Sequence, residues 1–259
     1  PEPQGTTWAT HGHVVVSYDE TLTFGAHGIY SRSPDDRKLL GAPSTPGEMS
    51  IIGGDVRFTG GAFGHGYLGY SHIDASNVLS LSDSVEVLHS FHGWNFKNNF
   101  LGRYNPRTGT AAPDDSGKVD TILFQYDLSI AALARHPTRF RGNGPDLNVS
   151  VFAMFNHVNS ETFTQDKFKW GADLVYQPFP VAGIGFRYDL VQPDLGAAEE
   201  SFAILSPRLI FQTDWLTKEQ VTVQYSRYFL GSRAFASFPY ADVDKADEDV
   251  LMVAARMWW

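Results

Sequence analysis

The 259-residue chain contains no cysteine, which excludes disulfides, thiolate metal sites and a catalytic cysteine. It also contains no apolar run that approaches the ~18 residues of a transmembrane helix. Any crossing of a membrane would therefore have to be made by strands. Basic residues are outnumbered, with a net charge of −9, and no basic stripe with interleaved aromatic residues is present. Nucleic acid is therefore not an expected partner.

Glycine, with 24 residues, and aromatic residues, at 14%, are abundant. The glycine pairs do not open a helix after a strand, as a phosphate-binding loop would, so no cofactor is predicted. The dominant pattern is a repeat of about ten-residue runs in which apolar and polar side chains alternate. In the run 182–190, Ala182, Ile184, Phe186, Tyr188 and Leu190 share one face. These period-two runs predict a single all-β, antiparallel domain over residues 1–259, with about twelve strands within a range of roughly 10–14.

Two segments depart from this alternation. In 76–92, the spacing of Val78, Leu81 and Val85 fits one face of a helix. The same stretch alternates in part, so a strand remains the alternative to the short helix predicted there. Pro207 interrupts another run, and because proline lacks a backbone N–H it predicts a bulge or the start of a strand.

The links between the runs differ in length. Short links lie at 177–181 and 214–219, and longer ones lie at 31–49, 104–118, 192–201 and 230–248. This contrast predicts tight turns at one end of the sheet and long loops at the other. Counting strands back from the C-terminus, however, puts the tight turns of the two halves at opposite ends unless the chain makes an extra crossing within 74–93. That crossing would leave the first and last strands parallel unless a further strand precedes them.

Alternation alone does not decide which face meets water. The polar face is rich in glycine and small polar groups with spaced charges, which suits a lumen where opposite charges pair across strands. The candidate lumen charges are Asp127, Lys169, Asp173, Arg187, Asp189, Arg208 and Arg256. Aromatic residues recur near the ends of the apolar runs, as in the girdles of membrane barrels. The candidate lipid-facing residues are Trp170, Tyr176, Ile184, Tyr188, Phe211, Tyr225 and Trp259.

The chain ends in DVLMVAARMWW, an alternating run that finishes on the aromatic Trp259. This end, together with the alternating runs, resembles the Gram-negative outer-membrane β-barrel class, whose members more often finish on phenylalanine. The resemblance implies an antiparallel transmembrane β-barrel in the outer membrane, with outer-membrane lipid and the barrel assembly machinery as partners. The alternative is a soluble all-β binding protein whose apolar face lines a core.

Within the barrel interpretation, two roles are open. The lumen charges could line a narrow pore and set its ion preference. Alternatively, the same charges could close the lumen by pairing, so that the barrel is an anchor that presents the loops 104–118 and 230–248 to a protein partner.

An outer-membrane lipid hydrolase is a further alternative. Its His–Ser candidates are Ser71–His72 and His89–Ser90, but adjacent residues of a strand point to opposite faces, so no catalytic residue is predicted. His11, His13 and His27 are weak candidates for a zinc or copper site. They are also explained as hydrogen-bonding groups of a polar interior, and no metal is assigned.

Overall fold

The computed structural model describes residues 8–19, 21–32, 38–39, 42–43, 47–61, 64–76, 116–135, 145–160, 164–214, 218–231 and 249–258. They contain an antiparallel sheet of 11 strands, in which each strand pairs with its neighbours in the chain. Its strands are β1 (Trp8–Tyr18), β2 (Leu22–Arg32), β5 (Glu48–Thr59), β6 (His65–Ser76), β7 (Gly117–Ser129), β8 (Asp146–Ser160), β9 (Thr164–Phe179), β10 (Ala182–Gln192), β11 (Phe202–Asp214), β12 (Lys218–Leu230) and β13 (Asp249–Trp258). The predicted all-β antiparallel fold is confirmed.

Smaller elements lie outside this sheet. A two-stranded ribbon pairs β3 (Lys38–Leu39) with β4 (Ala42–Pro43). A short helix, α3 (Ile130–Arg135), follows β7, and a 3-10 turn, η4 (Ala198–Glu200), precedes β11. No helix in the described ranges is both long enough and apolar enough to cross a membrane.

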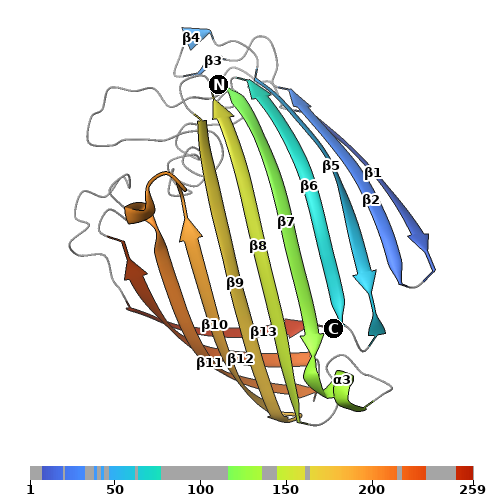
Figure 1. The fold of residues 1–259 in the computed structure, drawn as a ribbon, viewed down its shortest axis with the longest axis vertical. Helices are drawn as coiled ribbons and strands as arrows, with labels where there is room; N and C mark the ends of the chain where they lie inside the picture. Colours follow the sequence, from blue (N-terminus) through green and yellow to red (C-terminus); the bar gives the residue numbers. More distant parts are fainter. Residues whose placement is uncertain are drawn as a thin grey trace.

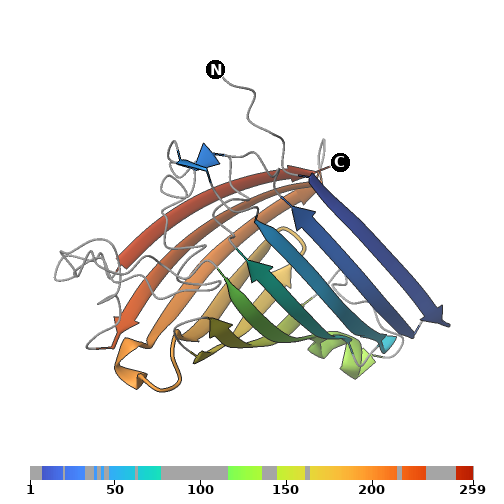
Figure 2. The same cartoon turned by 90° about the horizontal axis from the view of Figure 1, so that it is seen from above.

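The sheet is strongly curved and its two edges are open (Figures 1 and 2). Its edge strands, β1 and β13, are not paired with each other. We call the end where Tyr18, Thr59, Phe179 and Asp214 lie the turn end, and the end where Arg32, Ser76, Gln192 and Leu230 lie the loop end. Both β1 and β13 run from the loop end to the turn end, so the two edges are parallel in direction.

The extra crossing predicted within 74–93 lies, apart from its first residues 74–76, outside the described residues. Strand β6 pairs directly with β7, from His65 opposite Asp127 to Ala75 opposite Gly117. Strand β6 therefore ends at the loop end, and β7 begins at the same end. As a result the tight turns of both halves lie at the same end of the sheet. The helix predicted near 76–92 lies outside the described residues.

The β1–β2 turn is fixed by local hydrogen bonds. Asp19 adopts a positive φ of 51°, which aspartate tolerates better than most residues. Thr21 donates hydrogen bonds to the Asp19 carboxylate from its hydroxyl and from its backbone N–H, and they hold the pKa of Asp19 below its usual range. At the β5–β6 turn, Gly61 and Gly64 supply positive φ angles of 56° and 83°.

The sequence pattern extends the strand before α3 too far. Alternation continues through 130, but β7 ends at Ser129 and the chain turns into the helix. The Ser129 hydroxyl accepts a hydrogen bond from the N–H of Ala132, and a carboxylate oxygen of Asp146 accepts one from the N–H of Ala131. Because these acceptors satisfy the first helical N–H groups, the alanine-rich segment begins a helix here.

Pro207 lies inside β11 rather than at a bulge or a strand start, so that prediction is wrong. The register of β11 against β12 keeps the same offset on both sides of Pro207, but the two rungs at Ser206 and Pro207 are missing from the ladder. The buried hydroxyls of Ser206 and Ser226 approach each other to 2.9 Å at this gap. A side-chain hydrogen bond therefore joins the strands where proline interrupts the backbone ladder.

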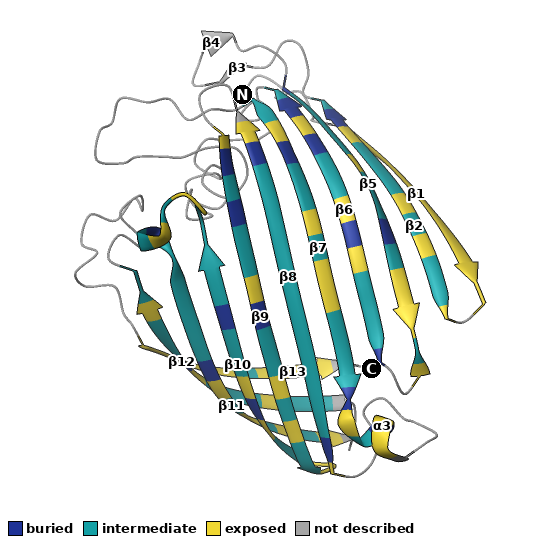
Figure 3. Cartoon of the chain, viewed as in Figure 1, coloured by how far each residue is buried: buried dark blue, intermediate teal, exposed yellow. Residues whose placement is uncertain are grey.

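Strand register divides the side chains into two faces. The buried residues of the sheet strands all lie on one face, which is the one expected on the concave side because curvature crowds its side chains; we call it the inward face. Besides Gly69, Gly171 and Gly185, they are Ser31, Asp55, Ile73, Ala75, Val119, Ser129, Asp146, Val158, Gln165, Lys167, Asp189, Ser206 and Ser226. The other face, called outward below, contributes most of the exposed residues on the strands between the two edges; exposed residues are yellow in Figure 3. At the loop end, Ile73, Ala75, Val119 and Val158 form a buried apolar cluster.

Candidate functional site: the outward face and the inner wall

The outward face exposes large hydrophobic side chains on ten of the sheet strands. They are Val14, Val16, Tyr18, Phe24, Tyr30, Ile52, Phe58, Leu68, Tyr70, Ile122, Phe124, Trp170, Leu174, Tyr176, Phe179, Ile184, Phe186, Leu209, Phe211, Val221, Tyr225, Phe229, Leu251, Val253 and Met257. Among the described sheet residues, the exposed large hydrophobics that point inward are Val15, Val250 and Met252, and all three are on the edge strands. The apolar exposure is therefore one-sided.

Aromatic rings lie toward both ends of this face. Tyr18, Phe58, Tyr176, Phe179 and Phe211 lie near the turn end, and Tyr30, Trp170, Tyr188, Tyr225 and Phe229 lie toward the loop end. The rings of Trp170 and Tyr188 are 5.4 Å apart. Of the predicted lipid-facing residues, strand register places Trp170, Tyr176, Ile184, Tyr188, Phe211 and Tyr225 here. Trp259 lies outside the described residues.

Charged and histidine side chains also lie on the outward face, nearly all of them near its loop end. They form five pairs between neighbouring strands, which we call the outer rim: Arg32–Glu48 at 3.4 Å, Lys118–Asp74 at 3.2 Å, His72–Asp120 at 2.8 Å, His157–Asp166 at 2.7 Å and Arg227–Asp249 at 2.9 Å. Between the rim and the turn end, the described outward face carries one charged residue. That residue is Glu219, which accepts a hydrogen bond from Thr213.

The outer rim was missed by sequence reasoning. Its residues occupy the apolar parity of each run, so they look like ordinary polar strand ends. The signal that could have found them is the recurrence of such a polar end on several runs beside the long loops. Recognising this recurrence as a continuous rim needs the cross-strand register.

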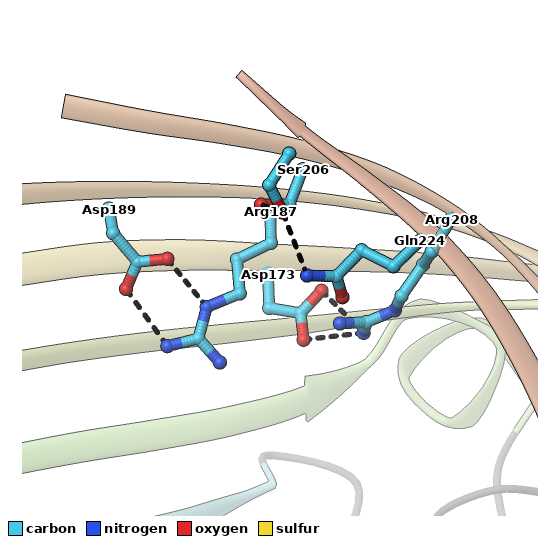
Figure 4. Close-up of polar contacts among 7 residues, drawn as sticks. Asp173, Arg187, Asp189, Ser206, Arg208 and Gln224 are labelled. Atoms are coloured by element: carbon cyan, nitrogen blue, oxygen red, sulfur yellow. Dashed lines mark hydrogen bonds and ion pairs between the residues drawn. The ribbon is translucent and has the colours of Figure 1, made fainter. Parts of the chain in front are cut away.

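The inward face carries the predicted lumen charges. Strand register places Asp127, Lys169, Asp173, Arg187, Asp189, Arg208 and Arg256 on it. Figure 4 shows two of their ion pairs. Arg208 Nη2 lies 2.6 and 2.8 Å from the two Asp173 oxygens, and Arg187 donates to both oxygens of Asp189 at 2.7 and 2.8 Å. The first pair joins β11 to β9 across β10, and the second lies within β10.

The remaining lumen charges make other contacts. Asp127 accepts hydrogen bonds from Gln125 at 2.8 Å and from Ser150. The ammonium of Lys169 lies 5.6 Å from the ring centre of Phe152. Arg187 covers the same ring at 5.0 Å, so a cation–π cluster adjoins the ion pairs. Arg256, on β13, is exposed.

Glycines let the inward side chains lie flat against the sheet. A Cβ atom at Gly185 would approach Arg208 to 2.5 Å, and one at Gly171 would approach Phe152 to 2.6 Å. Both separations are too short for a real Cβ contact, so a side chain at either glycine would force its neighbour to move. Asp55 and His27 lie over glycines in the same way on β2 and β5.

The three histidines of the weak metal prediction lie near one another on the inward face. His13 pairs with His27 across β1 and β2, and their ring centres are 6.5 Å apart. The rings of His11 and His13 are 6.3 Å apart. Within the described part of the chain, no group of three potential ligands is arranged to hold a metal ion.

The structure describes one of the two His–Ser candidates for a lipid hydrolase, Ser71–His72. Ser71 points inward and His72 points outward, since they are adjacent in β6. His72 Nδ1 bonds to Asp120, and His157 Nδ1 bonds to Asp166. No serine hydroxyl among the described residues hydrogen-bonds to either imidazole. The pair at 89–90 lies outside the described residues, as do 232–248 and most of the loop 104–118.

Comparison with models of known protein families finds no match, and comparison with curated proteins finds none either. The molecule does offer two surfaces of contrasting chemistry on one sheet. One is an exposed apolar band bounded by aromatic rings and a charged rim. The other is a polar inner wall with paired charges.

Proposed function

We propose that this chain is a membrane-spanning β-barrel whose lumen forms a narrow, charge-lined pore. The observation that carries the proposal is the one-sided exposure of large hydrophobic residues across the sheet. Soluble monomers rarely expose contiguous apolar patches larger than a few hundred Å², because water disfavours them. A bilayer is the partner that would cover such a band across ten of the eleven strands.

The dimensions support a bilayer. On β9, the outward apolar residues run from Phe168 to Phe179, which is roughly 36 Å of strand at about 3.3 Å per residue. A tilt of about 45° reduces this length to a height of about 25 Å, which matches the apolar band of known membrane barrels. The aromatic rings near its two ends fit the two interfaces.

In hydrocarbon every backbone polar group needs an internal partner, so the two open edges must be closed. Because β1 and β13 run in the same direction, direct closure would be a parallel pair. A strand from outside the described residues, inserted between them, would be antiparallel to both. Either arrangement makes the closed sheet that a barrel requires.

The inner wall favours a pore. Its long side chains lie against the sheet over glycines and are held by bidentate ion pairs, so they are drawn back from the barrel axis. Charges fixed on a narrow lumen wall set the ion preference of a channel. The second candidate is an anchor with a closed lumen, and it is favoured by the buried apolar cluster at the loop end.

Localisation in a Gram-negative outer membrane, with outer-membrane lipid and the barrel assembly machinery as partners, rests on the resemblance of the C-terminal strand to that class. In this orientation the tight turns face the periplasm and the loop end faces the outside of the cell.

The test begins with gel migration of the detergent-refolded protein, boiled against unboiled. A closed barrel predicts a mobility shift on boiling, and a chain that is soluble without detergent and shows no shift would refute the membrane assignment. Planar-bilayer recordings then separate the two roles, because a pore gives discrete conductance steps and an anchor gives none.

A further inference from the structure

We propose that the pore passes anions in preference to cations, and that Lys169 on the inner wall sets this preference. This inference rests on the proposed charge-lined pore, and it adds the class of solute that the pore takes. It follows from the balance of charge on the inward face and from the side chains that surround Lys169.

The two faces of the sheet carry opposite charge balances. On the described outward face, the five rim pairs and Glu219 give more carboxylates than permanent cations. The inward face has more cations than carboxylates. Its described cations are Arg57, Lys167, Lys169, Arg187, Arg208 and Arg256, and its described carboxylates are Asp55, Asp127, Asp146, Asp173 and Asp189. Because the whole chain has a net charge of −9, the excess of cations is particular to the proposed lumen face.

Most of the inward carboxylates are neutralised or withdrawn from the lumen. Three of them form ion pairs with arginine, and two of these pairs are drawn in Figure 4. The three pairs are Arg57–Asp55, Arg187–Asp189 and Arg208–Asp173. Asp146 is only 4% exposed, and it accepts hydrogen bonds from the Ser129 hydroxyl and the N–H of Ala131 at the start of α3. Its charge is therefore directed into the protein rather than into the lumen.

Lys169 has no such partner. Its ammonium lies 5.6 Å from the centre of the Phe152 ring, and no carboxylate of the described ranges lies within ion-pair distance of it. The inward residues directly opposite are Met154 on β8 and Val191 on β10, and both are uncharged. An aromatic ring attracts a cation without neutralising its charge, so Lys169 presents a full positive charge to the lumen.

The carboxylate on the next inward rung, Asp189, is committed to a different cation. Both of its oxygens accept hydrogen bonds from Arg187, at 2.7 and 2.8 Å, and the residue is 6% exposed. Arg187 and Lys169 also lie against the same Phe152 ring, at 5.0 and 5.6 Å. This part of the wall therefore holds two cations around one ring and one buried carboxylate, which leaves it positive.

The depth of Lys169 strengthens its effect. It lies between Phe168 and Trp170, where the outward apolar band of β9 begins at the loop end. The wall behind Lys169 would then face hydrocarbon, and a charge in front of a wall of low dielectric acts over a longer distance than a charge in water. Lysine and arginine side chains that line a narrow pore favour anions.

Asp127 is the inward carboxylate that opposes this preference. It accepts hydrogen bonds from the neutral donors Gln125 and Ser150, and no described cation forms an ion pair with it. Arg256, an exposed inward cation of β13, offsets its charge. The positive charge of Lys169 therefore remains in excess.

The experiment measures reversal potentials of the refolded protein in planar bilayers under a gradient of potassium chloride. Potassium and chloride have similar mobilities in water, so the sign of the potential reports the preference of the pore. Lys169→Gln removes the proposed determinant. Lys118→Gln is the matched control, because it removes the same charge from the outward face. Asp127→Asn changes the lumen charge in the opposite direction.

The wild type is expected to pass chloride roughly threefold better than potassium, the order of effect of one unpaired charge close to the path of an ion. Lys169→Gln should lose most of this preference, and Lys169→Arg should keep it because the charge is retained. Asp127→Asn should increase the preference, and Lys118→Gln should match the wild type.

The outcomes separate this inference from the proposed pore. A barrel without discrete conductance would overturn the pore and the inference with it. A conducting wild type that prefers potassium, or that shows no preference, would overturn the inference alone, as would equal shifts in Lys169→Gln and Lys118→Gln. If Lys169→Gln does not refold, the sign of the wild-type preference and the increase expected for Asp127→Asn still decide the question.

Discussion

The loop end and the middle of the same sheet differ in which face is apolar: the inward face at the loop end, and the outward face in the middle. At the loop end, Ile73 and Val119 are buried on the inward face, while their polar neighbours His72 and Asp120 point outward and contact each other. In the middle, Ile184 is exposed outward, while the neighbouring inward positions carry glycine and paired charges. The first arrangement is typical of a protein in water, and the second is typical of a barrel in lipid.

This inversion shows that alternation specifies two faces without specifying their environments. The strand register is unbroken where the polarity changes on β6, β7 and β8, so the same pleat supports both arrangements. The level of the inversion therefore marks where the proposed bilayer ends. Four substitutions test this contrast, and they follow in order of expected effect.

The largest effect is expected at the loop-end cluster. Val158 is fully buried, with 0% of its surface exposed. Val158→Asp would place an unpaired charge in this cluster, which we expect to lower the free energy of unfolding by about 3–5 kcal/mol. Urea unfolding of the refolded protein measures the change. Asn159→Asp, at the exposed outward neighbour, is the control and should have little effect; equal stability of the two variants would show that the loop-end interior is not a dry core.

The next effect is expected in the apolar band. Ile184 is 53% exposed on the outward face, and Ile184→Arg should impair assembly because a cation near the bilayer midplane costs about 2–4 kcal/mol on a lipid face. The fraction of protein with boiling-dependent mobility after refolding measures assembly. Thr222→Arg, on the inward face of β12, is the matched control. Gly185 is unsuitable as a control because the Arg208 side chain occupies the space that a new side chain would need. If Ile184→Arg and Thr222→Arg assemble equally well, the outward face does not meet lipid.

A smaller effect is expected on the inner wall. Arg208→Gln would leave the half-buried Asp173 carboxylate without its bidentate partner, at about 1–3 kcal/mol of unfolding free energy. In a pore, the uncompensated carboxylate should also raise cation selectivity. Reversal potentials under a salt gradient measure this selectivity. Arg227→Gln removes an outward partner of Asp249 and should leave selectivity unchanged, so a shift of equal size in both variants would contradict a wall lined by Asp173 and Arg208.

The sequence predicted the face of the sheet on which each residue lies better than it predicted where each strand ends. The period of two indicated the strands and the face of each residue, because side-chain direction is a local property of a strand. Arg208 and Asp173 were predicted as lumen charges from that local property, but their contact with each other depends on the register of three strands. The alternation could not show that β7 stops at Ser129, because the capping carboxylate of Asp146 comes from the next strand.

Topology was harder to predict than pattern. The pairing of β6 with β7 joins segments that are far apart in the chain, and no local signal specifies such a partner. The outer rim required the same information, since its members come from different strands and meet only in register. Arg187 also pairs with Asp189 two residues away and lies over the ring of Phe152 on β8. Which of its neighbours Arg187 contacts depends on side-chain packing, so the sequence pattern could not predict these partners.

The smallest effect on stability is expected at the rim itself. Lys118 and Asp74 are both about half exposed, and pairs in such positions contribute about 0–1 kcal/mol because water and salt screen them. Lys118→Gln should therefore change the free energy of unfolding by less than about 1 kcal/mol in detergent, measured by urea titration at low and high salt. The substitution tests whether the Lys118–Asp74 pair braces β6 against β7. A loss of several kcal/mol in detergent would mean that this exposed pair holds the two strands together.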